Sequence, residues 1–100
     1  MAASGGDIGK MKQRIGTRGG GSYRVLMIDD VRHSETFVAK FLPKAVPAVT
    51  SADARNIFHK SRILGAAVVL VTVKEHAEFY AHMMLRGGLK SAIEPDSDTA

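Results

Sequence analysis

Residues 65–73 read Gly65-Ala66-Ala67-Val68-Val69-Leu70-Val71-Thr72-Val73, and the architecture can be worked out from this stretch in both directions. A glycine often closes a helix in the left-handed conformation, so Gly65 predicts that a helix ends just before the apolar run. The run is too short for a buried helix and rich in β-branched valine, which is typical of a strand covered on at least one face. We predict that residues 66–73 form the central strand of a sheet.

Helical patterns flank this strand on both sides. Thr50 or Ser51 can cap the upstream helix, since both side chains accept hydrogen bonds from a first helical turn. Its core positions share one face: Ala54, Ile57, Phe58 and Ser61. Downstream, Thr72 and Glu75 have the spacing of a capping box. The third helix that they introduce carries Ala77, Tyr80, Met83 and Met84 and closes at Gly87-Gly88.

Two further strands and one helix complete the pattern. Residues 23–28, Tyr-Arg-Val-Leu-Met-Ile, form a β-rich run that Asp29-Asp30 ends. A first helix starts after Ser34 as its cap and fades near Pro43, where a proline removes a backbone bond. Leu89–Ile93 is the last strand. The order βααβαβ predicts an α/β fold of the α+β kind, with three helices packed on a small, largely antiparallel three-stranded sheet.

Charge and composition divide the 100 residues into one domain and two flanking segments. Residues 1–22 contain four basic side chains and one acidic one, which gives +3, while residues 23–100 contain ten basic and nine acidic ones, which gives +1. The first segment has no aromatic residue and seven glycines, so it cannot bury enough apolar surface to order itself. We expect a disordered basic arm over 1–22, a core domain over 23–96 and a flexible tail over 97–100.

Composition also limits the compartment and the partners. There is no cysteine, so disulfides and thiolate metal sites are excluded and a reducing, intracellular compartment is expected. The longest apolar stretch, Ile63–Val73, falls short of the roughly 20 residues of a membrane helix, so no membrane contact is expected. The arm has no apolar signal region, although its basic, acid-poor composition leaves a plastid transit remnant open. Its four scattered charges do not favour a nucleic-acid partner.

No pattern in the sequence favours an enzyme. Residues 24–30 resemble the first strand of a receiver domain, whose acidic pair helps to hold magnesium, but residues 66–73 lack the phosphoacceptor aspartate. Asp29, Asp30 and His33 could be read as metal ligands, but three exposed polar residues at a strand end explain them better. No Gly-x-Ser-x-Gly motif or phosphate loop is present. We therefore expect a binding protein without a cofactor or a metal.

Several segments, taken in order, resemble the ClpS adaptors of ATP-dependent Clp proteases over residues 23–96. The matching segments are Tyr23–Asp30, Phe37-Val38, Pro47–Thr50, Ala54, Asn56-Ile57, Gly65 before the valine-rich strand, Ala77–Tyr80 and Gly88–Pro95. The last two look most like the cyanobacterial and plastid branch. The resemblance implies a disordered arm, a core that docks on the N-terminal domain of a Clp-family ATPase, and a pocket that captures destabilising N-terminal residues. A ribosomal-stalk domain shares the topology but is acidic and lacks this strand-end signature.

The chain departs from the family pattern where the substrate N-terminus is held. The usual Asn-Asp-Asp reads Asp29-Asp30-Val31, and the usual histidine near the end of the second helix falls at Arg62. The resemblance thus places the N-terminus against Asp29, Asp30 and Arg62, which sum to −1. Because arginine repels an ammonium, we expect Asp29 to pin Arg62 and to leave Asp30 and a spare carboxylate oxygen for the ligand.

The resemblance also assigns a hydrophobic pocket and a docking residue. The usual gating methionine falls at Glu35, which makes the rim more polar. The positions assigned to the wall or rim are His33, Glu35, Val38, Phe58, Ser61 and Leu89. Glu75 matches an acidic position that contacts the ATPase, and its capping role is the competing explanation.

The sequence therefore predicts a monomeric, non-enzymatic adaptor. It would deliver proteins with particular N-termini to a Clp-family ATPase, in a bacterial-type cytoplasm or a plastid stroma. Two alternatives remain at this point: a ClpS-like scaffold or inhibitor that occupies the ATPase without recognising N-termini, and a receiver-like or stalk-like module.

Overall fold

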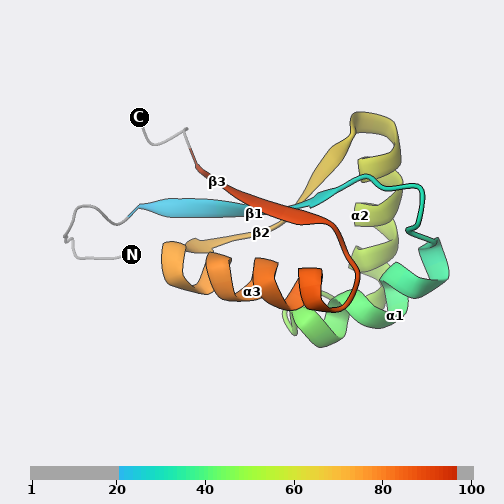
Figure 1. Ribbon diagram of the computed structural model, residues 1–100, viewed down its shortest axis with the longest axis horizontal. Coiled ribbons are helices and arrows are strands. Elements are labelled where there is room, and N and C mark those ends of the chain that lie inside the picture. The colour runs from blue at the N-terminus through green and yellow to red at the C-terminus, as the bar shows by residue number, and fades with distance from the viewer. Residues whose placement is uncertain (1–20, 97–100) are drawn as a thin grey trace.

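The predicted order of elements is confirmed over residues 21–96, the part of the chain that the computed structural model describes. The expected arm and tail fall almost wholly in residues 1–20 and 97–100, outside the described residues. The elements are β1 (Ser22–Ile28), α1 (Glu35–Ala45), α2 (Ser51–Leu64), β2 (Ala66–Val73), α3 (Lys74–Arg86) and β3 (Ser91–Pro95) (Figure 1). Within the described part, none of the helices combines the length and apolar character needed to cross a membrane.

The three strands form an antiparallel sheet in the order β2-β1-β3, which confirms the expected sheet. The prediction that residues 66–73 are the central strand is wrong, because β1 lies between the other two. Val25 and Met27 of β1 are fully buried, whereas Val68, Val71 and Val73 of β2 are about half exposed. The apolar character of β2 therefore reflects an edge strand with one face partly open.

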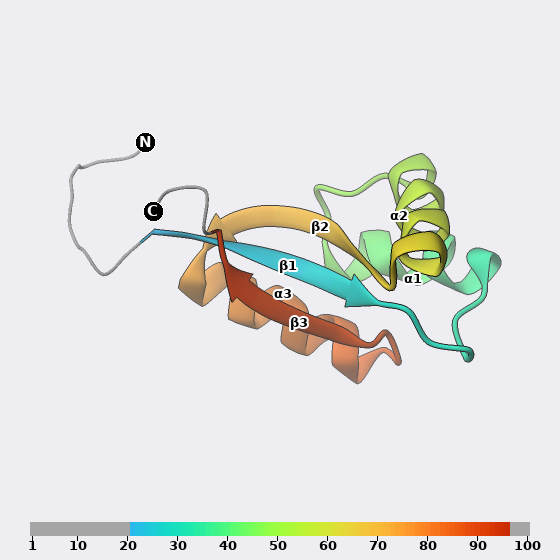
Figure 2. The ribbon, with the colours of Figure 1, turned by 90° about the horizontal axis from the view of Figure 1, so that it is seen from above.

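The helices occupy two places around the sheet. α3 runs along one face and contacts all three strands, while α1 and α2 pack on each other near the end where β1 stops (Figures 1 and 2). This arrangement confirms the α+β fold class. The largest fully buried apolar side chains come from β1 (Val25, Met27), from α1 and α3 (Val38, Leu42, Met84) and from the segments that follow these two helices (Val46, Leu89).

The first helix continues past its proline. Ser34 caps α1 as predicted, with its Oγ accepting from the Phe37 N–H at 3.1 Å. The expectation that the helix fades near Pro43 is wrong, since α1 continues to Ala45. Pro43 cannot donate to the carbonyl of Ala39, four residues earlier. The hydroxyl of Ser51 donates to that carbonyl instead, at 3.2 Å, so the freed acceptor stays satisfied.

The caps of the other helices were predicted only in part. Thr50 caps α2 and forms a capping box with Asp53, and Gly65 closes the helix with φ of 90°. The predicted capping box at Thr72 is wrong, because Thr72 lies within β2 opposite Tyr23. The cap position of α3 is Val73, which makes no side-chain cap hydrogen bond.

The last strand begins two residues later than predicted and ends at Pro95. The Leu89 N–H donates to the Met84 carbonyl at 2.8 Å, so Leu89 still belongs to the turn that follows α3. Lys90 then turns its backbone N–H to the side chain of His33 at 3.1 Å. This contact brings the start of β3 to the loop that follows β1.

Candidate binding site at the end of β1

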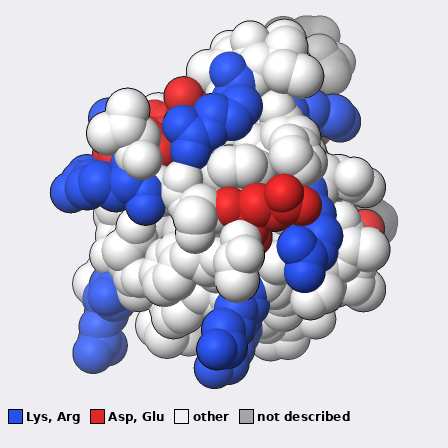
Figure 3. Space-filling model, turned by 90° about the vertical axis from the view of Figure 1, so that its right-hand side faces the viewer, with Lys and Arg blue, Asp and Glu red and all other residues white. Residues whose placement is uncertain are grey.

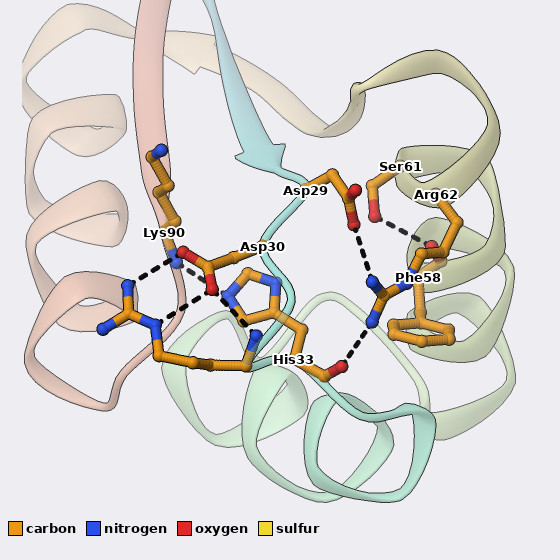
Figure 4. Close-up of polar contacts among 8 residues, drawn as sticks. Asp29, Asp30, His33, Phe58, Ser61, Arg62 and Lys90 are labelled. Atoms are coloured by element: carbon orange, nitrogen blue, oxygen red, sulfur yellow. Dashed lines mark hydrogen bonds and ion pairs between the residues drawn. The ribbon is translucent and has the colours of Figure 1, made fainter.

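The end of β1 is joined to the end of α2 by a backbone contact. The Asp29 N–H donates to the Gly65 carbonyl at 2.9 Å. From there the side chain of Asp29 points toward α2, whereas that of Asp30 points to the opposite side (Figure 4). The structure therefore brings Asp29 and Arg62 together and separates Asp30 from both. The three residues predicted to hold the substrate N-terminus thus do not surround one point.

The expected pairing of Asp29 with Arg62 is confirmed. Asp29 Oδ1 lies 3.5 Å from Arg62 Nη1, which is an ion pair without hydrogen-bond geometry. Arg62 Nη2 donates to the backbone carbonyl of His33, and the guanidinium carbon lies 4.9 Å from the centre of the Phe58 ring. Three groups thus hold the Arg62 guanidinium in place: a carboxylate, a carbonyl and an aromatic face. Asp29 Oδ1 itself is buried and has no hydrogen-bond partner.

Asp30 is held by Arg32, a residue absent from the predicted site. Oδ1 accepts from the Arg32 backbone N–H at 2.8 Å and from Nε at 2.9 Å, and Oδ2 accepts from Nη2 at 2.8 Å. The side-chain and backbone hydrogen bonds from Arg32 hold the pKa of Asp30 well below its usual range. The sequence does carry a signal for this contact, because an aspartate commonly accepts from the N–H two residues later.

Arg32 also changes the charge of the site. Asp29 and Asp30 give −2 and Arg62 and Arg32 give +2, so these four side chains sum to zero, against the −1 expected without Arg32. Over residues 29–64, six Lys and Arg face four Asp and Glu, a balance of +2. The α1–α2 end of the molecule accordingly shows more basic than acidic surface (Figure 3). The surroundings offer little general attraction to a cation.

The interpretation of His33 as an exposed polar residue at the strand end is wrong, because His33 is buried with 4% of its surface exposed. Its Nε2 accepts from the Lys90 N–H, so the neutral ring carries its proton on Nδ1. Nδ1 is buried and has no hydrogen-bond partner. The pKa of His33 is lowered, and burial is the largest cause. The charges of Asp30 and Asp29 raise this pKa, whereas those of Arg62 and Arg32 lower it further.

The lowered pKa of His33 predicts a loss of stability in mild acid. The unfolded chain takes up this proton near pH 6.5, before the native state does. The stability contribution of neutral His33 is therefore complete above about pH 6.5 and falls as the pH drops toward its lower native pKa. His33→Gln, which keeps an acceptor for Lys90, should give a flatter profile of melting temperature between about pH 7.5 and pH 5. The exposed His82→Gln should match the parent; equal slopes in all three proteins would contradict the prediction.

The positions predicted for the pocket wall are covered by protein. The buried residues of this group are His33, Val38, Phe58, Ser61 and Leu89. The Ser61 hydroxyl donates back to the Phe58 carbonyl at 2.8 Å, within α2. Glu35 is the exception: its side chain is 39% exposed and lies near Arg55 and His59, at 3.4 and 3.3 Å. Their roles in an apolar pocket and its rim therefore stay predictions.

Glu75 lies away from this site, at the other end of the sheet (Figure 1). It is exposed in the first turn of α3, close to the pair that Ser22 and Val73 make at the end of the strands. Its capping role is not seen, since no side chain caps this helix.

Comparison with known proteins places the chain among adaptors. No protein-family model matches it. It is 38% identical over 88 residues to the chloroplastic Clp protease adapter protein CLPS2 of Chlamydomonas reinhardtii, covering 88% of this chain and 52% of that protein. It is 38% identical over 74 residues to ClpS of Gloeobacter violaceus, covering 74% and 80%. CLPS1 of Arabidopsis thaliana is 40% identical over 75 residues, covering 74% and 46%. The match thus spans about half the length of the two chloroplastic relatives.

A solved structure shows the same fold. Agrobacterium tumefaciens ClpS2 bound to L-phenylalaninamide superposes with a TM-score of 0.63 at 21% identity, over 76% of this chain and 98% of that one. The cyanobacterial relative is matched over 80% of its length. The chain therefore belongs to the ClpS family of adaptor proteins of ATP-dependent Clp proteases.

Proposed function

We propose that the chain is a non-enzymatic adaptor that binds a free protein N-terminus beside Asp29 and delivers the protein to a Clp-family ATPase. The observation that carries the proposal is Asp29 Oδ1, a buried acceptor without a hydrogen bond at the end of β1. A free α-amino group has a pKa near 8 and is mostly a cation at pH 7, so it would supply the missing donors. The solved relative that shares this fold binds an amino-acid amide.

Glu75 would serve the second contact, with the N-terminal domain of the ATPase. Its carboxylate is exposed and has no capping role in α3. It lies at the end of the sheet opposite Asp29, so one molecule could hold a substrate and the ATPase at separate surfaces. The three relatives matched by sequence are chloroplastic or cyanobacterial, which supports a plastid stroma or a bacterial-type cytoplasm as the site of action.

One observation favours the alternative function of a scaffold or inhibitor. Asp29 already forms an ion pair with Arg62, and Asp30 already accepts three hydrogen bonds from Arg32. A site filled by its own side chains binds N-termini poorly, while docking through Glu75 would not be affected.

Peptide binding separates the two functions. We expect calorimetry to detect binding of short peptides with a free N-terminal Leu, Phe, Tyr or Trp, and to detect none with the same peptides acetylated. Acetylation removes the positive charge and leaves the side chain unchanged, so it isolates the contact with Asp29. An adaptor would lose binding on acetylation. A protein that binds the ATPase domain and none of the peptides would be the scaffold or inhibitor.

A further inference from the structure

The guanidinium of Arg62 makes the contacts that a ligand cation would need. It pairs with the Asp29 carboxylate at 3.5 Å, donates to the His33 carbonyl and lies over the Phe58 ring at 4.9 Å. These groups come from the loop after β1 and from α2, and they face one point (Figure 4). An anion, a carbonyl oxygen and an aromatic face together form a binding site for a cation.

Two buried polar atoms of the residues that Arg62 contacts lack hydrogen-bond partners. Asp29 Oδ1 and His33 Nδ1 are both buried without a hydrogen bond. One is an acceptor and the other a donor, because His33 Nε2 is already an acceptor for the Lys90 N–H. Buried polar atoms without partners are costly in a folded protein and often mark a site completed by a ligand. Asp29 Oδ1 lies directly against Arg62, so a ligand reaches it only after the guanidinium moves.

The geometry points to Arg62 as a competitor built into the chain: its guanidinium occupies the cation site at Asp29, and an incoming N-terminal ammonium must displace it. This inference rests on the proposed function, since it concerns the same site. It assigns to Arg62 the role of a gate that sets affinity, in place of a direct ligand contact. Arginine has only donors and cannot bind an ammonium, so the side chain opposes the ligand as long as it stays in place.

The position of Arg62 allows this movement. It lies in the last turn of α2, three residues before Gly65, where the helix dipole favours a cation in either position. Its side chain is 35% exposed, so a displaced guanidinium has solvent on one side. The apparent affinity of a gated site is the intrinsic affinity multiplied by the fraction of molecules that are open.

The test measures peptide affinity in variants of the gate. Arg62→Gln should bind a free N-terminal Leu or Phe peptide about tenfold more tightly than the parent, as expected for a gate closed about nine-tenths of the time. Arg62→Lys should lie between them, because an ammonium keeps the charge but cannot hold Asp29 and the His33 carbonyl together. Lys60→Gln removes the same charge from an exposed position of the same helix and should change affinity less than about twofold. Acetylated peptides should gain nothing from Arg62→Gln.

Nitrogen-detected NMR of the arginine side chains tests the gate without depending on the tighter variant. The Nη groups of Arg62 should rotate slowly in the free protein and quickly once peptide is bound. Weaker or unchanged binding by Arg62→Gln, or freely rotating Nη groups in the free protein, would overturn the gate and leave the proposed function intact if the parent still binds. Absence of free-N-terminus binding in the parent and in every variant would instead reject N-terminus recognition, and the gate with it.

Discussion

Gly87→Ala is expected to lower the free energy of unfolding by about 2 kcal/mol. This is the opposite of the usual effect, since alanine in helical backbone is normally more stable than glycine. Gly87 has φ of −88°, so an alanine there would gain roughly 0.5 to 1 kcal/mol from backbone entropy alone. A Cβ at this position, however, would lie 1.7 Å from Cζ of Phe41 and 1.9 Å from Cε2. The Phe41 ring stacks on Phe37 and would have to leave its place, so overpacking wins.

Urea unfolding of two backgrounds identifies the cause. In Phe41→Leu, which removes the ring, the added cost of Gly87→Ala should fall to less than half. Gly88→Ala is the matched control, since Gly88 has φ of 95° and only Phe37 Cζ near its Cβ position, at 3.9 Å. Its cost of roughly 1 to 2 kcal/mol comes from the left-handed backbone and should be the same with Phe41 or Leu. Equal costs of Gly87→Ala in both backgrounds would show that the ring is not responsible.

Glu75→Lys is expected to weaken binding to a Clp-family ATPase N-terminal domain by about thirtyfold or more, the effect of losing a contact worth about 2 kcal/mol. The substitution should leave the fold intact. Glu75 does not cap α3, so reversing its charge affects the free energy of unfolding only through the dipole of that helix. This effect is about 1 kcal/mol at most.

Surface plasmon resonance against the isolated ATPase domain, with a melting curve for each variant, measures both effects. Glu78→Lys introduces the same charge change on an exposed residue of the same helix and should bind like the parent. A folded Glu75→Lys protein with unchanged affinity would remove Glu75 from the proposed interface. Equal losses in both variants would mean that net charge, and not this position, sets the affinity.

Features fixed by neighbouring residues were predictable from the sequence. Ser34, Thr50 and Gly65 cap their helices as expected, because each cap depends on residues within one turn. The continuation of α1 past Pro43 was not predictable, since the carbonyl freed by the proline is satisfied by Ser51, twelve positions after its acceptor. The central place of β1 was also missed, because pairing order is set by how helices and strands pack and not by the hydrophobicity of one strand.

The candidate site was likewise predictable only in part. The pairing of Asp29 with Arg62 was predicted because their charges change together relative to the family pattern, and the structure confirms it. Arg32 was missed although its spacing from Asp30 is a local signal. The hydrogen bond from the Lys90 N–H to His33 could not be predicted, because the two residues are 57 positions apart in the chain.

The central place of β1 has a consequence for the order in which the protein forms. β1 is the first strand to be synthesised, yet Tyr23 pairs with Thr72 on one side and with Pro95 on the other. Pairs so distant in sequence close large loops and slow folding, whereas α1 and α2 need only local contacts. During translation one edge of β1 therefore stays unpaired until β2 has left the ribosome, and the other edge stays unpaired until β3 has left it. A chaperone that shields this first strand would act on the nascent chain at the stage when it is most prone to aggregate.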